Sequence, residues 1–309
     1  MGITIHDLLE AGVHFGHQTR RWNPKMKSYI FGNRNGIHIF DLGKSMVGLN
    51  NACKFLYEKV AKGGDVLWVG TKRQAQELVK EAAERSGQHA ITQRWMGGTL
   101  TNIETIRKSV AKLSKFRKWE EDGTLAAMKK KEAGRIRREA VKLESSISGI
   151  MGMGRIPSCI VVIDTVKEHL AIKEANALGI PVVAILDTNS DPDLVQYGIP
   201  GNDDAVRSLQ VLIGQLSEAC YMGKGISDKH NEERKATRSK DEGERKARAD
   251  KGEQAPRGER RERAPAGDRA PRAPAGDRAP RAPAGDRAPR APAGDRAPRA
   301  AKTGEAKAE

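Results

Sequence analysis

The chain has 309 residues, three cysteines and a formal net charge of +15. Its length suffices for one or two domains with a hydrophobic core, and its charge favours a polyanionic partner such as nucleic acid or an anionic surface. Widely spaced cysteines without a Cys-x-x-Cys pair exclude a disulfide framework and a zinc ribbon. The absence of a long apolar run or a signal peptide excludes a membrane span and secretion. We therefore expect a cytoplasmic protein without a membrane partner.

The first predicted element is a short helix, Thr4–Gly12, and a basic loop, Val13–Lys27, follows it. Basic side chains interleaved with aromatic rings can pair with phosphates and stack on bases. The alternative is an irregular loop with Phe15 and Trp22 in the core, and both arrangements can hold at once. The candidate RNA contacts in this loop are Arg20, Arg21, Trp22, Lys25 and Lys27.

A hairpin turn and a helix come next. Asn35-Gly36 between apolar runs predicts a turn at 33–36, with Arg34 as a candidate RNA contact and a strand at Ile37–Leu42. The spacing over Lys44–Lys62 predicts a helix, and the unbroken apolar run Val66–Val69 is typical of a strand buried on both faces.

Two cations follow that strand. Gly70-Thr71-Lys72-Arg73 leads into a predicted helix, Gln74–Arg85, and then a strand, His89–Thr92. A strand, a glycine turn, two cations and a helix start form an anion site, so Lys72 and Arg73 are candidate RNA contacts. A solvated turn is the alternative, and the spacing does not match a P-loop.

The stretch Arg94–Asn102 joins this sheet pattern to a helical segment. A guanidinium beside an indole, followed by two glycines, suits a polyanion because backbone N–H groups can approach phosphate there. The alternative is a buried tryptophan beside a tight turn. The candidate RNA contacts are Arg94, Trp95, Gly97, Gly98, Thr99 and Asn102.

A helical hairpin is predicted as an insertion at 102–148. Apolar residues recur every three or four positions from Ile103 to Phe116 and from Leu125 to Ile147, on either side of a polar turn at 121–124. Two such legs make an antiparallel hairpin with a coiled-coil-like seam. Its outer positions are rich in Lys and Arg, which either contact phosphate or are simply solvated. The candidate RNA contacts are Lys108, Lys112, Arg135 and Arg138.

Strands and helices alternate again after the hairpin. The pattern predicts strand Cys159–Asp164, helix His169–Leu178, strand Pro181–Leu186 and a last helix ending near Cys220. With Ile37–Leu42, Val66–Val69 and His89–Thr92, these make five strands. Such alternation predicts an α/β fold with a doubly wound parallel sheet.

Two acidic clusters, 187–193 and 203–204, fall at the expected carboxyl edge of that sheet, where doubly wound folds bind ligands. Paired carboxylates with a histidine from the first loop can hold a metal ion. Asp and Asn are also the usual turn and cap residues, which is the alternative that we favour.

The C-terminal segment 225–309 differs in composition from the rest. It holds 23 basic and 16 acidic residues, and four identical copies of Ala-Pro-Ala-Gly-Asp-Arg-Ala-Pro-Arg run from Ala264 to Arg299. Beyond Ala and Pro, its apolar content is a single residue, Ile226. We therefore predict a folded domain at 1–224 and a disordered basic tail at 225–309.

Several of these motifs together resemble the bacterial S-two family of the small ribosomal subunit over about residues 3–224. The similar segments are 14–18, 22–26, 70–73, 94–102, 187–192 and 199–204. The resemblance implies a flavodoxin-like sheet with an inserted hairpin. It also implies binding to small-subunit rRNA between head and body, and help in docking the large S-one protein.

The resemblance implies no enzymatic activity, no cofactor and no homo-oligomer. Family members with a nearby zinc make His17, Asp187 and Asp203 the metal positions to watch. Two other hypotheses are a nucleotide-dependent enzyme and a metal-dependent module on the same fold. A doubly wound sheet hosts many chemistries, but no phosphate-binding motif lies in the right context.

Overall fold

The structure, a computed structural model, describes residues 2–250, although not the side chains of 236 and 238–250. The four-copy repeat, and with it the predicted disorder of 251–309, lies outside the described residues.

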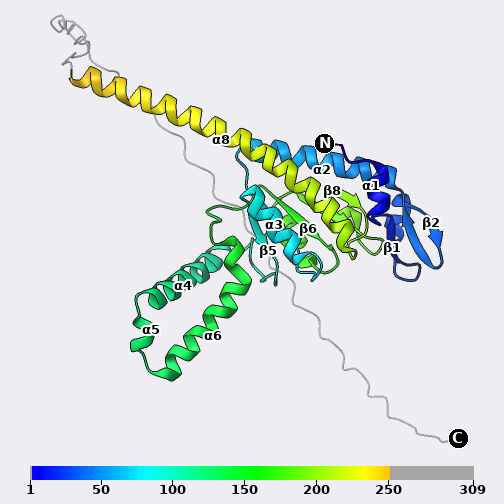
Figure 1. The fold of residues 1–309 in the computed structure, drawn as a ribbon, viewed down its shortest axis with the longest axis horizontal. Coiled ribbons are helices and arrows are strands. Elements are labelled where there is room, and N and C mark those ends of the chain that lie inside the picture. Colours follow the sequence, from blue (N-terminus) through cyan, green and yellow to red (C-terminus); the bar gives the residue numbers. More distant parts are fainter. Residues whose placement is uncertain (1, 251–309) are drawn as a thin grey trace, which may run out of the picture. The chain divides into compact units, whose positions relative to one another are not determined.

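Five parallel strands form the main sheet (Figure 1). They are β4 (Val66–Val69), β5 (His89–Ile91), β6 (Cys159–Ile163), β7 (Val182–Leu186) and β8 (Tyr197–Pro200). Their spatial order is β5-β4-β6-β7-β8, so in chain order the strands lie 2-1-3-4-5. This is the flavodoxin-like order, and the predicted doubly wound α/β class is confirmed.

One predicted member of the five is wrong. Ile37–Phe40 is β3 of a separate antiparallel sheet, and the fifth parallel strand is β8, in a segment where no strand was predicted. β8 has four residues, including Gly198 and Pro200, and it lies at the sheet edge. Proline is tolerated there because an N–H group on the outer side of an edge strand has no partner to lose. With glycine and proline in four residues, β8 lacks the apolar run that marks the buried strands.

Alternate residues of the inner strands face two hydrophobic cores. In β4, Val66 and Trp68 lie in one core while Leu67 and Val69 lie in the other. All four are fully buried, as the unbroken apolar run predicts.

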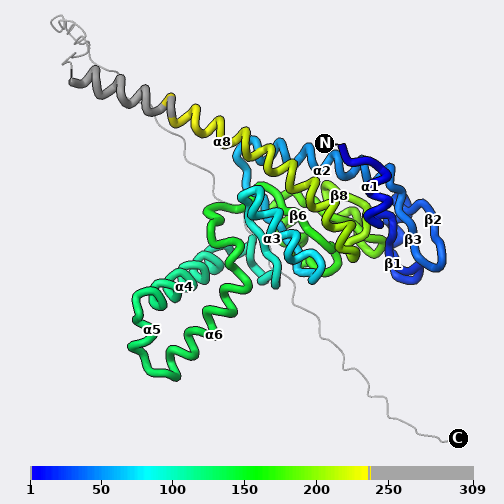
Figure 2. The backbone as a smooth tube through the Cα atoms, viewed as in Figure 1, coloured from blue at the N-terminus to red at the C-terminus, as the bar shows by residue number. Residues whose placement is uncertain are grey.

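Helices cover both cores, and the main helices over the first core lie side by side (Figure 2). The first set is α2 (Leu42–Ala61), α3 (Gln76–Ser86) and α8 (Val206–Asp250), and α7 (His169–Ala177) covers the other face together with the base of the hairpin. A short α1 (Ile5–Glu10) begins with a capping box at Thr4 and Asp7.

The basic loop is part of a small antiparallel sheet, β1 (Phe15–Gln18), β3 (Ile37–Phe40) and β2 (Ile30–Arg34), with a 3₁₀ turn at Pro24–Tyr29. Strand β1 was not predicted. The predicted turn is confirmed, since Asn35 and Gly36 have φ of 53° and 75°, the left-handed pair of a tight hairpin.

The predicted helical hairpin is present. Its legs are α4 (Ile103–Glu121) and α6 (Lys130–Ile147), with a short α5 (Thr124–Ala127) between them. Leu113, Phe116 and Leu125 are buried in the seam. A 3₁₀ turn, Ser148–Ile150, packs against β5 before the chain continues to β6, and another, Pro192–Leu194, precedes β8.

The prediction that the last helix ends near Cys220 is wrong, because α8 continues to Asp250 and the first part of the predicted tail, 225–250, is helical. After Met222 the only large apolar residue up to Asp250 is Ile226, so hydrophobic periodicity gives no signal there. Lys, Arg, Glu and Ala dominate that stretch and favour helix by propensity alone. Within residues 2–250, no helix is both long and apolar enough to cross a membrane.

Candidate nucleic-acid interface

The basic loop is anchored to the domain at its centre and exposes its cations. Asn23 donates its backbone N–H to the Thr188 carbonyl at 2.7 Å, and Met26 is completely buried. Arg20, Arg21, Lys25, Lys27 and Arg34 are exposed around these anchors. The loop therefore presents positive charge from a fixed backbone.

Three rings of this region lie outside the core. Phe15 is 47% exposed, Trp22 37% and Phe31 79%. The Trp22 ring lies 5.2 Å from the ring of His38, whose two nitrogens are buried without a hydrogen-bond partner among the described residues. Of the two alternatives for the loop, exposed rings beside exposed cations is the arrangement found.

Lys72 points into the acidic edge of the sheet. Its ammonium lies 2.7 Å from Asp203, 2.6 Å from Asp204 and 3.6 Å from Asp164. Burial acts to lower the pKa of Lys72, but the hydrogen bonds and charges of these carboxylates outweigh it and raise the pKa. Lys72 thus compensates carboxylates, whereas Arg73 is exposed.

The turn 94–102 has an internal partner for its donors, the Glu174 carboxylate on α7. Oε1 accepts the indole N–H of Trp95 at 3.0 Å and the backbone N–H of Gly98 at 2.8 Å. Oε2 accepts the N–H groups of Leu100 at 3.0 Å and Thr101 at 3.2 Å, and the Thr101 hydroxyl at 3.2 Å. The backbone donors expected to face phosphate are therefore bonded to a carboxylate of the same chain.

Side chains of this turn divide by exposure. Trp95 is 6% exposed and Thr99 is fully buried, so the buried-tryptophan alternative holds for these two. Gly98 has φ of 87°, a conformation that favours glycine. Arg94, Gly97 and Asn102 are exposed, and the Asn102 side chain makes no cap bond to α4.

Partial burial raises the pKa of the Glu174 carboxyl, but the hydrogen bonds from Trp95, Gly98, Leu100 and Thr101 outweigh it and lower the pKa below its ordinary value. Glu174 is therefore ionised at neutral pH. Sequence reasoning missed it because a glutamate on an amphipathic helix carries no signal of a distant partner.

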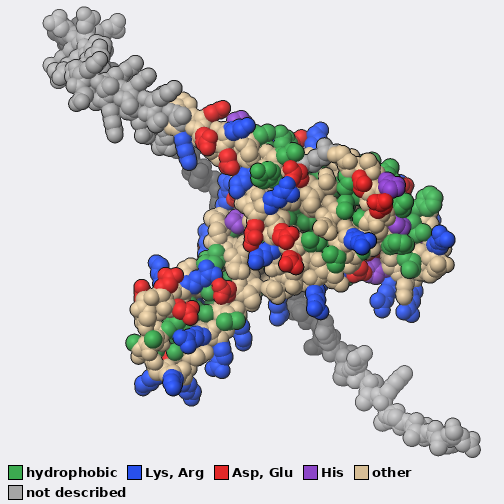
Figure 3. Space-filling model, in the orientation of Figure 1, with side chains coloured by type: hydrophobic (Ala, Val, Ile, Leu, Met, Phe, Trp, Pro, Cys, Tyr) green, Lys and Arg blue, Asp and Glu red, His purple; other side chains and the backbone are tan. Residues whose placement is uncertain are grey.

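Ion pairs cross the hairpin between its legs. Lys112 pairs with Glu139, and Arg117 pairs with Glu144 at 2.6 Å. Lys108, Arg135 and Arg138 are exposed and form no ion pair within the described residues. Arg135, Arg138, Glu139 and Lys142 line a surface hollow of about 470 Å³. Figure 3 shows Lys and Arg side chains gathered on the hairpin and near the small sheet.

Two of the three predicted metal positions come together, and a different residue completes the set. His17 Nδ1 lies 2.9 Å from Asp187 and Nε2 lies 3.5 Å from Asp204, while Asp203 pairs with Lys72 instead. One ligand atom from each of His17, Asp187 and Asp204 lies within 4.8 Å of the others.

This donor set fits zinc in kind, since zinc takes histidine nitrogen and carboxylate oxygen. The His17–Asp187 hydrogen bond matches the carboxylate partner that usually orients a zinc-binding histidine. Here the ion would cross-link the first loop to the sheet edge. Elemental analysis of the purified chain tests whether it is present.

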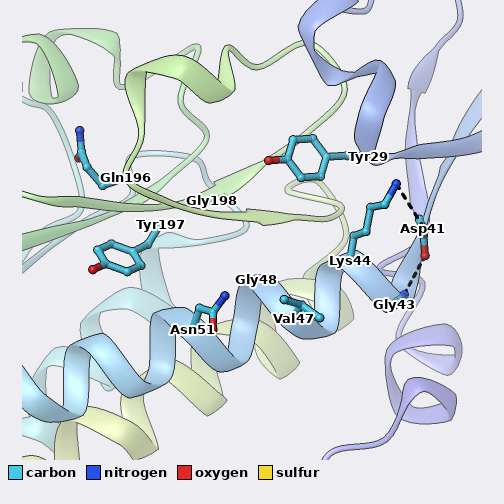
Figure 4. A pocket seen from close by; sticks show the side chains of 10 residues that line it. All are labelled: Tyr29, Asp41, Gly43, Lys44, Val47, Gly48, Asn51, Gln196, Tyr197 and Gly198. Atoms are coloured by element: carbon cyan, nitrogen blue, oxygen red, sulfur yellow. Dashed lines mark hydrogen bonds and ion pairs between the residues drawn. The ribbon is translucent and has the colours of Figure 1, made fainter.

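A pocket of about 430 Å³ lies between α2 and the edge of β8 (Figure 4). Tyr29, Lys44, Val47, Asn51 and Tyr197 are among its lining residues. Lys44 bonds the Ser28 carbonyl and lies 3.6 Å from Asp41, so its charge is compensated. The pocket supplies no free cation for phosphate.

Comparisons with known proteins identify the family. Residues 8–223 match the family described as Ribosomal protein S2. The "Small ribosomal subunit protein uS2" of Oleidesulfovibrio alaskensis is 51% identical over 224 residues, covering 72% of this chain and 86% of the relative. That of Sorangium cellulosum is 49% identical over 230 residues, covering 74% and 83%.

The fold and these matches define a structural ribosomal protein rather than an enzyme. The chain belongs to the ribosomal protein S2 family. The predicted resemblance is thereby confirmed for the domain, while the match ends before the C-terminal repeat.

Proposed function

We propose that the chain binds small-subunit rRNA between the head and body of the subunit, as a single copy in the cytoplasm, and helps to dock the large S-one protein. The relatives are small-subunit proteins by name, which supports the proposal that this chain binds the small subunit. The RNA surface consists of two groups of cations, one on the first loop and small sheet and one on the hairpin.

The observation that carries the proposal is a set of exposed cations without ion pairs in the described part of the chain. Phosphates compete poorly for a lysine already held by carboxylates, so Lys25, Lys72 and Lys112 contribute less than their positions suggest. The remaining predicted cations are Arg20, Arg21, Lys27, Arg34, Arg73, Arg94, Lys108, Arg135 and Arg138.

Salt dependence tests the RNA contacts. Each neutralised phosphate contributes about 0.7 to 0.9 log units of affinity per log unit of salt. Replacing Arg135 and Arg138 together by Gln lowers that slope by about 1 for each phosphate that is no longer neutralised. The charge-matched control replaces Lys54 and Lys62, exposed cations on and just after α2, by Gln.

The measurement is filter binding of small-subunit rRNA across a salt series. Equal slopes for R135Q/R138Q and K54Q/K62Q would remove the hairpin from the interface. An affinity of the unaltered chain that does not respond to salt would refute RNA binding through cations altogether.

Exposed rings on the small sheet support the protein partner. Phe31 on β2 is 79% exposed and Phe15 on β1 is 47% exposed, so both outer strands of the sheet carry an exposed ring. Aromatic side chains are common anchors of protein interfaces. We expect Phe31→Ala to weaken capture of purified S-one protein by about tenfold, a loss within the range of a single interface anchor. Val47→Ala, at an exposed apolar residue on α2, serves as its control.

A further inference from the structure

Glu174 joins two parts of the chain that are distant in sequence. It lies on α7, and its carboxylate accepts five hydrogen bonds from the segment 95–101, where the chain leaves the sheet for the hairpin. Charge-assisted bonds of this kind are the strong ones, and a five-fold set on one carboxylate fixes both of its oxygens. The end of the hairpin where the chain enters α4 is therefore held to α7.

The carboxylate takes the place that a capping side chain would fill. Asn102, the N-cap residue of α4, makes no side-chain cap bond. Three backbone N–H groups just before the helix point instead at Glu174. A helix N-terminus favours a negative group, so the charge of Glu174 also suits the dipole of α4.

The other end of the hairpin, where the chain leaves α6, is held by packing. A Cβ at Gly149 would overlap the Ala90 carbonyl oxygen, so the returning chain lies directly on β5. Arg107 of α4 donates a hydrogen bond to the Gly154 carbonyl at 2.7 Å, which links the entering and the leaving segments of the hairpin. Ile147 and Ile150 are buried in the same core as Ala171 and Ile172 of α7. The direction of the hairpin thus depends on the hydrogen bonds to Glu174 at one end and on packing against β5 at the other.

We propose that Glu174 is a positioning residue for RNA binding by the hairpin. It touches no RNA itself, and its carboxylate holds the hairpin in its bound direction before RNA arrives. This inference rests on the proposed function, because it assumes that Arg135 and Arg138 contact phosphate. A fixed hairpin loses less conformational entropy on binding than one that swings about its base.

The direction in which one substitution changes RNA affinity separates a positioning role from simple electrostatics. Glu174→Gln removes a negative charge, which by charge alone strengthens binding to RNA. Positioning predicts the opposite, because an amide offers one acceptor oxygen where five donors converge. Glu77→Gln, an exposed residue in the first turn of α3, removes the same charge away from the hairpin base and gives the electrostatic baseline.

The experiment uses the full chain and filter binding of small-subunit rRNA at fixed salt. We expect E174Q to bind about tenfold more weakly, a loss of about 1.4 kcal/mol, while E77Q binds equally well or better. Glu174→Asp keeps the charge and is expected to bind between the two. Amide hydrogen exchange at Leu100 and Thr101 rises in E174Q while the sheet strands stay protected, which separates local release from unfolding.

A double-variant cycle completes the test. In the R135Q/R138Q background, E174Q is expected to weaken binding less than twofold, because the side chains that it positions are already replaced. An unchanged affinity of E174Q, or an equal loss in both backgrounds, would overturn the positioning role and leave the proposed function intact. Absence of RNA binding by the unaltered chain would instead overturn the proposed function.

Discussion

At the scale of single residues, the cations of this chain divide into those that hold the fold and those that face solvent. Lys72 is 14% exposed among three carboxylates, whereas Arg21 and Arg135 are exposed with no ion pair in the described part of the chain. A compensated charge stabilises structure and an uncompensated one attracts polyanions. Position in a motif alone does not distinguish the two.

Lys72→Met tests the structural group. Three carboxylates would lose their shared cation, and we expect a loss of roughly 3 kcal/mol in the free energy of unfolding. Urea unfolding measures it. Lys25→Met is the control, because Lys25 is 48% exposed and pairs with the exposed Asp193, so its loss is expected to be far smaller than that of Lys72. Similar losses in both variants would contradict the assignment.

Glu174 predicts a pH dependence of stability. Its folded pKa is lowered, so its contribution is fully present above the unfolded pKa of about 4.3 and is lost as pH falls through the folded pKa. We expect the unaltered chain to be more stable than E174Q at pH 7, with a difference that shrinks as the pH drops below about 4. Chemical unfolding of both proteins from neutral to acidic pH measures the gap. A gap that stays constant with pH would argue against an ionised, hydrogen-bonded Glu174.

At the scale of elements, two glycines near the hairpin have opposite roles. Gly149 lies against the Ala90 carbonyl, whereas Gly134 is inside α6 with open space around its Cβ position. Gly149→Ala forces the returning chain off β5 and is expected to destabilise the domain by roughly 1–3 kcal/mol. Gly134→Ala is expected to stabilise it by up to about 1 kcal/mol, because alanine favours the helix. Thermal unfolding compares the two, and the same sign in both would contradict the packing described.

Strands with strong apolar signals are predictable, whereas β1 and β8, which lack such signals, are not. Val66–Val69 and Cys159–Ile163 are buried on both faces, and their apolar runs identify them directly in the sequence. β1 has only exposed and partly buried residues, and β8 contains Gly198 and Pro200. Such strands form because a neighbour offers backbone partners, which is a property of the sheet and not of the segment.

At the scale of the whole molecule, the hairpin and the first loop both carry exposed cations that form no ion pair among the described residues. We expect a chain without the hairpin, 103–147 replaced by a short Gly-Ser linker, to co-sediment poorly with small ribosomal subunits. A chain that ends at Asn231 should still bind, because it keeps the packing of α8 on α2, where Ser227 lies 3.5 Å from the Cβ position of Gly63. Full binding without the hairpin would move the main interface to the loop.

Apolar periodicity and charge are local properties of the chain, so the amino-acid sequence was enough to establish the doubly wound α/β class, the helical hairpin and the basic surface. Only the folded molecule shows which strand completes the sheet, that Lys72 lies among carboxylates, and that Asp204 rather than Asp203 joins His17 and Asp187. Only there, too, does Glu174, 73 residues beyond Thr101, accept the donors of the hairpin base. These outcomes depend on long-range pairing, in which a donor or a charge takes whichever partner the fold brings within reach.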